Sequence, residues 1–209
     1  MAANYDKIAG VYDSLSRMVF GKSIVRAQVC LLPFILPGGR ILIVGGGTGW
    51  ILEEIAQRYP QDLTIDYIES SAKMIALSRR RNCRKNVVNF IQQPIEDANL
   101  SQPYDVIITP FLFDNFQKDK VSLVFEKLDC KLKPNGRWLF ADFISVADSP
   151  FWQKLLLKIM YFFFRVTSKI PTTELVPMDD YFSTYQLEFE AYHFRRFIRS
   201  AVYKKVREV

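Results

Sequence analysis

The stretch that decides the fold is "ILIVGGGTGWILEEI", residues 41–55. Four apolar residues run into a cluster of glycines, and a helical pattern of apolar residues follows at once. A strand that turns through glycine into a helix is the first half of a βαβ unit, and in open α/β sheets such a turn borders the ligand site. The stretch therefore predicts a strand, a ligand-binding turn and a helix in that order.

The spacing of the glycines discriminates between ligands. Gly45, Gly47 and Gly49 form a GxGxG pattern, with Gly46 inside it. A dinucleotide-binding turn needs GxGxxG, whose third glycine falls on Trp50, the largest side chain available. This disfavours a nicotinamide-dependent reductase. Glycine lets the backbone pass close to a ligand, so we predict cofactor contacts at all four glycines.

An acidic residue closes the next predicted strand. Glu69 lies twenty residues after Gly49 and is followed by Ser70. A carboxylate at this place can accept hydrogen bonds from both ribose hydroxyls of an adenosine. The alternative is a tight strand–helix turn with a surface glutamate. We predict that Glu69 and Ser70 bind the cofactor.

Apolar runs alternate with helical patterns along the chain, which predicts a parallel, doubly wound sheet. The predicted parallel strands are 40–44, 63–68, 87–92, 105–109 and 136–143. The predicted helices between them are 49–58, 71–81 and 118–132, and turn signals lie at 36–39, 59–62 and 133–136. Two further strands, 187–194 and 197–205, are joined by Arg195 and Arg196. The predicted fold class is a Rossmann-like α/β sheet of five parallel strands plus a C-terminal antiparallel hairpin, seven strands in all.

We predict a single domain over residues 1–209, with N-terminal lid helices at 1–35 and a helical cover segment at 144–180. Within the cover segment, Ser149 is a suitable N-cap for a long apolar helical pattern that ends near residue 169. Its basic residues fall on one stripe: Lys154, Lys158, Arg165 and Lys169. The extra apolar surface fits either plain packing, in the domain or against a second subunit, or a pocket for a lipophilic acceptor beside anionic headgroups.

Composition and charge argue against several classes of protein function. The 209 residues carry a net charge of +6, much of it near the C-terminus, without a recognisable nucleic-acid motif, so we expect no nucleic-acid partner. Cys30, Cys83 and Cys130 are scattered and form no CxxC, which favours a reducing, cytoplasmic setting with buried thiols and no metal site. The N-terminus has no apolar export signal.

The GxGxG turn with an acid closing the second strand resembles the class I S-adenosylmethionine-dependent methyltransferases. "LKPNGR" (132–137) is similar to a turn common in that family, and "YDKIAGVYDSLSRMVFG" (5–21) and "TPFLFDN" (109–115) are similar to the ubiquinone/menaquinone C-methyltransferase subfamily. The resemblance implies S-adenosylmethionine as cofactor and methyl transfer as activity. It also implies Tyr5 and Tyr12 as lid residues, Tyr12 and Pro110 as cofactor contacts, and Pro94 and Ile95 beside the adenine.

Two positions depart from the family. Ile43 stands where an acid usually ends the first strand, and Pro94 stands where an acid often follows the third. The main-chain NH of Ile95 remains available to the adenine ring. These departures keep a non-catalytic S-adenosylmethionine-binding regulatory protein open as the alternative to an enzyme.

The expected acceptor is a small molecule, apolar or quinone-like. Asp114, Asn115 and Asp142 follow the fourth and fifth strands and are expected to orient or cap, while His193 is expected to be structural. The sequence identifies no catalytic residue. It leaves a monomer and a homodimer open, and also a peripheral contact with a membrane.

Overall fold

The computed structural model describes residues 6, 18–144, 150–153, 155–157 and 175–206. Among these residues, no helix is long and apolar enough to cross a membrane. Tyr5, Tyr12, Ser149 and the four basic residues of the predicted stripe lie outside the described residues.

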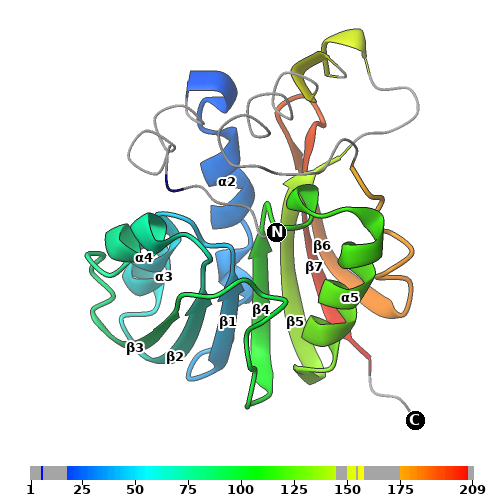
Figure 1. Cartoon of the computed structure of the whole chain (residues 1–209). Coiled ribbons are helices and arrows are strands. Elements are labelled where there is room, and N and C mark those ends of the chain that lie inside the picture. Colours follow the sequence, from blue (N-terminus) through cyan, green and yellow to red (C-terminus); the bar gives the residue numbers. More distant parts are fainter. Residues whose placement is uncertain (1–5, 7–17, 145–149, 154, 158–174, 207–209) are drawn as a thin grey trace.

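Seven strands form one sheet in the order β3-β2-β1-β4-β5-β7-β6 (Figure 1). They are β1 (Arg40–Val44), β2 (Gln61–Ile68), β3 (Lys85–Ile91), β4 (Tyr104–Pro110), β5 (Leu132–Phe143), β6 (Tyr185–His193) and β7 (Ile198–Lys205). β1 to β5 are parallel to one another, and β7 is antiparallel to both β5 and β6. This confirms the predicted fold class. The chain reverses its direction of travel between β1 and β4, which is the switch point where open α/β sheets bind ligands.

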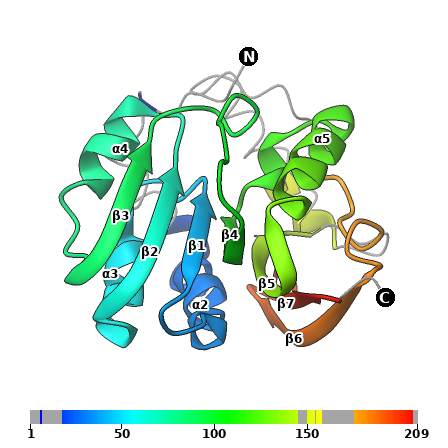
Figure 2. The same ribbon diagram turned by 90° about the horizontal axis from the view of Figure 1, so that it is seen from below.

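The helices cover both faces of the sheet. The labelled helices of the described residues are α2 (Ser23–Val29), α3 (Trp50–Arg58), α4 (Ala72–Ser78) and α5 (Lys118–Asp129), with short 3-10 turns η1 (Leu32–Phe34) and η2 (Phe113–Asn115). In Figure 2, α2 and α3 lie on one face and α5 on the other. α3 buries Ile51, Leu52 and Ile55, which recur on one side of a helix of 3.6 residues per turn.

The hydrophobic core consists of two main clusters, one on each face of the sheet. One buried cluster, under α3 and α4, contains Ile41, Ile43 and Tyr67; the other, under α5, contains Trp138 and Phe140. Alternate residues of a strand point to opposite faces, so the central strands are apolar on both sides. Burying each such side chain contributes about 1.5–3 kcal/mol.

Three expectations from the sequence are wrong in detail. The turn predicted at 133–136 lies inside β5, because Asn135 takes a left-handed conformation and the register with β4 shifts there, which makes a bulge. The connection between β6 and β7 spans residues 194–197, and its first three residues all have positive φ. The thiols are not fully buried: Cys130 is exposed, and Cys30 and Cys83 are half-buried.

Candidate functional site

The glycine turn joins β1 to α3 at the carboxyl edge of the sheet. Different structural constraints favour glycine at Gly46 and at Gly47. A Cβ on Gly46 would lie 2.4 Å from the ring of Tyr67, so this residue is small because the tyrosine packs under it. Gly47 has φ +63°, and a Cβ there would meet no atom of the described residues within 4 Å. The turn therefore leaves open space at Gly47, where a ligand would lie against the backbone.

Tyr67 organises this turn. Its hydroxyl donates a hydrogen bond to the Gly47 carbonyl at 3.0 Å, and its ring is fully buried. Ile43, where the resemblance described above leads us to expect an acid, pairs with Tyr67 across β1 and β2 and is fully buried in the same apolar cluster. The turn is thus held by a phenol rather than by a carboxylate at position 43.

Glu69 follows β2 and lies directly beside the glycine turn. Its Oε2 accepts a hydrogen bond from the Gly47 NH at 3.1 Å, and its Oε1 accepts one from the Ser71 NH at 2.9 Å and one from the Ser70 hydroxyl at 3.4 Å. The side chain is only 7% exposed, and this burial raises the pKa of the carboxyl, although the amides that it binds oppose the shift. The structure therefore brings together Glu69, Ser70 and Gly47, three of the residues predicted to bind the cofactor.

Asp6, near the N-terminus, lies close to Glu69. Asp6 Oδ1 accepts hydrogen bonds from the Ser71 hydroxyl at 2.6 Å and from the Lys73 NH at 3.1 Å. These bonds lower the pKa of the Asp6 carboxyl. Ser71 is also the N-cap of α4, through the Met74 NH. A residue of the predicted lid segment thus contacts Ser71, which follows Glu69 by two positions in the chain.

Pro94 and Ile95 form a turn after β3. The Pro94 carbonyl accepts hydrogen bonds from the NH groups of Asp97 and Ala98, both at 3.1 Å. The Ile95 side chain is buried in the core under α5, so this residue can meet a ligand only through its main chain. Lys120 and Lys127 of α5 bind the side chain and the carbonyl of Glu96, which fixes the turn against that helix.

The turn after β4 borders the glycine turn from the other side. Pro110 is the buried last residue of β4, and the following Phe111 has φ +52°. A Cβ on Gly45 would lie 3.2 Å from the Leu112 side chain, so the two turns are in contact. The Asn115 amide donates to the Phe111 carbonyl at 2.9 Å and closes the turn.

Two carboxyl groups lie at the ends of β4 and β5. Asp142 is 2% exposed, and its two oxygens accept hydrogen bonds from the NH groups of Phe113 (2.9 Å) and Phe143 (2.8 Å). Burial raises the pKa of Asp142 to about 7. The pKa of Asp114 is also raised well above its ordinary value, by burial and by the neighbouring Asp142 charge. Among the described residues, no lysine or arginine forms an ion pair with either carboxyl.

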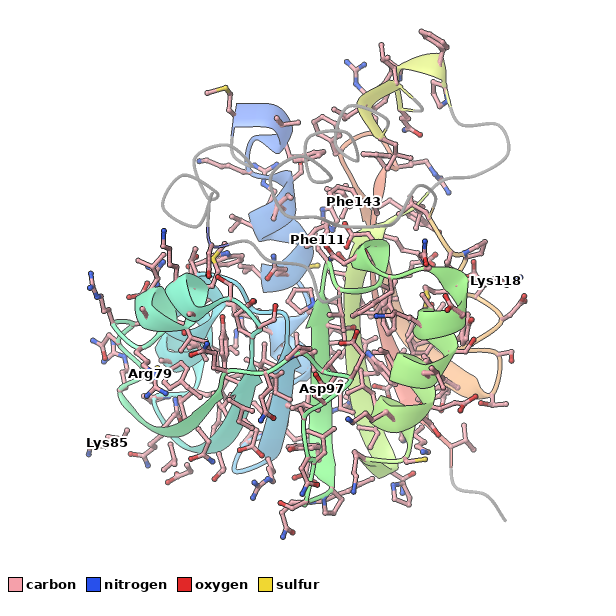
Figure 3. All side chains as sticks on the ribbon, viewed as in Figure 1. Arg79, Lys85, Asp97, Phe111, Lys118 and Phe143 are labelled. Atoms are coloured by element: carbon pink, nitrogen blue, oxygen red, sulfur yellow. The ribbon has the colours of Figure 1, made fainter. Side chains whose placement is uncertain are left out.

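An aromatic cluster covers the same edge of the sheet, next to the two carboxyls. Its members come from five segments: Phe20, Phe111, Phe143, Trp152, Phe194 and Phe197. The ring centroids of Phe111 and Phe143 are 4.9 Å apart, and Figure 3 labels these two side chains above β4 and β5. Trp152, in the predicted cover segment, packs on Phe194 at 5.9 Å. The wall on this side is therefore apolar and aromatic.

His193 lies away from these groups, at the end of β6. Its Nε2 is 3.8 Å from the Cys30 sulfur, and burial together with the nearby Arg26 lowers the pKa of the imidazole. This fits the structural role expected for it. Within the described residues, no group of three or more His, Cys, Asp or Glu side chains could hold a metal ion.

Comparison with known proteins agrees with this geometry. Residues 41–136 match the family model described as a methyltransferase domain. This stretch of the chain is similar to the S-adenosylmethionine-dependent methyltransferases. That family uses S-adenosylmethionine as its cofactor.

Among solved structures, the magnesium protoporphyrin IX methyltransferase of Synechocystis, which contains bound S-adenosylhomocysteine, matches with a TM-score of 0.65. The match covers 96% of this chain and 97% of that one at 16% identity, which establishes a common fold.

Curated relatives differ in the acceptor that their names give. A malonyl-[acyl-carrier protein] O-methyltransferase of Halalkalibacterium halodurans is 36% identical over 49% of this chain. The ubiquinone/menaquinone biosynthesis C-methyltransferase UbiE of Geotalea daltonii is 32% identical over 66% of it. The chain spans 38% of the length of the first relative and 61% of the second. These relatives therefore do not determine which acceptor this chain methylates.

Sequence reasoning missed two residues of the site. Tyr67 looked like one more apolar residue of a buried strand, although its place two residues before Glu69 puts both side chains on the same side of β2. Asp6 is separated from Ser71 by 65 positions, and no local pattern reports such a contact.

Proposed function

We propose that the chain transfers the methyl group of S-adenosylmethionine to a small, apolar acceptor of the quinol or phenol type. The observation that carries this proposal is the open space at Gly47 directly beside the Glu69 carboxylate. Adenosine lies along the ends of β1, β2 and β3, with Glu69 on the ribose, Ser70 beside it, and the main chain of Pro94 and Ile95 along the adenine.

The methionine half of the cofactor points toward β4. Because the adenosine occupies the β2 side of the switch point, the sulfonium lies over the contact between the two turns, near Gly45 and Pro110. The acceptor lies beyond it, against Phe111 and Phe143 of the aromatic cluster. Displacement at an activated methyl carbon needs mainly placement and exclusion of water, which an aromatic wall supplies.

A peripheral membrane contact belongs to the same proposal. Met18 and Phe151 are 81% and 79% exposed, and their segments both rise above the carboxyl edge of the sheet (Figure 1). Arg195 and Arg196, in the turn beside Trp152, are exposed as well. Exposed apolar side chains together with exposed arginines favour an anionic lipid surface, from which an apolar acceptor would enter.

Calorimetric titration of the purified protein with S-adenosylhomocysteine and with NADH tests the cofactor. We expect binding of the first ligand and no tight binding of the second, and the reverse result would refute the assignment. Methyl transfer from labelled S-adenosylmethionine to reduced naphthoquinones and simple phenols then tests the acceptor class. A protein that binds the cofactor but methylates none of them would favour the regulatory alternative.

Vesicle flotation tests the surface contact. Wild type is expected to float with anionic vesicles, and a Met18→Ser/Phe151→Ser variant is expected to remain unbound at the bottom of the gradient. Flotation of both proteins to the same extent would remove these side chains from the contact.

A further inference from the structure

The carboxyl pair Asp114–Asp142 makes none of the cofactor contacts proposed above. We propose that this pair is the base of the reaction, and that the acceptor is therefore one that loses a proton when it is methylated, a quinol carbon or a phenol oxygen, rather than a carboxylate. The proposal rests on the proposed function and names its acceptor class more closely.

The position of the pair is the first argument. Asp114 lies in η2, directly after β4, and Asp142 is the next-to-last residue of β5. The turn that contains Asp114 touches the glycine turn at Gly45, on the side of the switch point toward which the methyl group points. The pair thus lies on the acceptor side of the methyl group, beside Phe111 and Phe143.

The hydrogen bonds of Asp114 and Asp142 indicate a different role for each carboxyl. Asp142 uses one oxygen for each of two main-chain NH groups, so its carboxyl is fixed in place and also holds the turn after β4. Asp114 is only half-buried, and its Oδ1 accepts a hydrogen bond from the Asn115 amide at 2.7 Å. Asp114 is therefore the member that can meet a ligand, and Asp142 is the positioning residue.

Charge is the third argument. Asp142 is buried and Asp114 half-buried, and neither carboxyl has a cationic partner among the described residues. The two carboxyls therefore do not both ionise at neutral pH; the pair carries at most one negative charge and titrates as a unit. A pair of carboxyls that gains or loses a proton near neutral pH is suited to act as a general base. The same negative charge repels a carboxylate acceptor, which loses no proton on methylation and needs no base.

The proposed step is balanced. The acceptor's C–H or O–H bond breaks and its proton passes to the carboxyl pair, while its electron pair forms the new bond to the methyl carbon. The C–S bond breaks and its electrons remain on sulfur, which gives S-adenosylhomocysteine. The pair then returns its proton to water.

The first test needs no acceptor. S-adenosylmethionine and S-adenosylhomocysteine differ by the charged sulfonium methyl, so the ratio of their Kd values reports a negative charge near the reacting atoms. In wild type we expect the preference for S-adenosylmethionine to grow roughly three- to tenfold between about pH 5.5 and about pH 8.5, as the pair ionises. A flat ratio in wild type, with both ligands bound, would overturn the proposal while leaving the proposed function intact.

Variants locate the charge. An Asp114→Asn/Asp142→Asn double variant is expected to give a flat ratio, and Asp119→Asn, an exposed aspartate five residues along the chain, is expected to behave as wild type. Circular dichroism and Tm report whether the double variant is folded; if it is not, the wild-type ratio alone decides. If neither ligand binds wild type at any pH, the proposed function itself fails.

The second test separates acceptor classes. With a reduced naphthoquinone as acceptor, we expect kcat to fall below about pH 7 in wild type, and Asp114→Asn to lower kcat at least tenfold without a matching change in KM for S-adenosylmethionine. Methylation of a malonyl thioester, with a rate independent of pH through this range, would overturn the proposal.

Discussion

Replacing Glu69 by glutamine tests the cofactor site most directly. The substitution keeps the size of the side chain and removes its charge. Glutamine has one acceptor oxygen where Glu69 has two, and the native carboxylate accepts main-chain hydrogen bonds at 3.1 and 2.9 Å on separate oxygens. One of the NH groups of Gly47 and Ser71 must therefore face an amide NH2 in the variant.

The magnitudes follow from burial. Leaving one buried NH group without its acceptor costs about 1–3 kcal/mol of stability. Glu69 is 7% exposed, so water cannot readily replace the lost acceptor. Loss of a charge-assisted hydrogen bond to the ribose costs about 1.5–3 kcal/mol in cofactor affinity, which is roughly a 10- to 150-fold rise in Kd. The rise in Kd has to be measured below the Tm of the variant.

Calorimetric titration with S-adenosylhomocysteine is the assay, with Tm measured on the same samples. Glu126→Gln on the exposed side of α5 is the matched control and should change neither quantity. Because burial raises the pKa of Glu69, wild type should also lose affinity on acidification sooner than an ordinary glutamate would predict, and the variant should not. An unchanged Kd in a folded variant would show that Glu69 does not contact the cofactor.

Three further results are expected. Gly47→Val should abolish binding of S-adenosylhomocysteine in calorimetry, because its side chain occupies the open space and strains a residue at φ +63°, whereas Gly38→Val, equally strained but in the turn before β1, should still bind. Tyr67→Phe should lower stability by about 0.5–1.5 kcal/mol in urea unfolding, since the Gly47 carbonyl loses its donor; an unchanged midpoint would mean that this bond contributes nothing. The free energy of unfolding should fall as pH rises from about 4 and level off above about 7, because the unfolded chain releases the Asp142 proton near 3.8 and the folded protein near 7; equal slopes in wild type and Asp142→Asn would contradict this origin.

The sequence by itself determined the sheet. The alternation of apolar runs and helical patterns, the GxGxG turn and the acid at position 69 are local features, and each reports a strand, a turn or a strand end directly. Parallel strands place their carboxyl ends at one edge, so these features also predicted the edge of the sheet at which a cofactor would bind. Boundaries shifted where a positive-φ residue such as Asp62 or Asn135 let a strand continue through an apparent turn.

Only the tertiary structure decided how the site is held. That Gly46 is small to admit Tyr67, that Asp6 reaches Ser71, and that Asp114 lies against Asp142 all depend on contacts between segments 20 to 65 residues apart. Sequence patterns report which face of an element is apolar, but not which side chain of another element meets it. The ionisation of a carboxyl is set by its burial and its neighbours, so the pair at the ends of β4 and β5 becomes visible only when the two strands lie side by side.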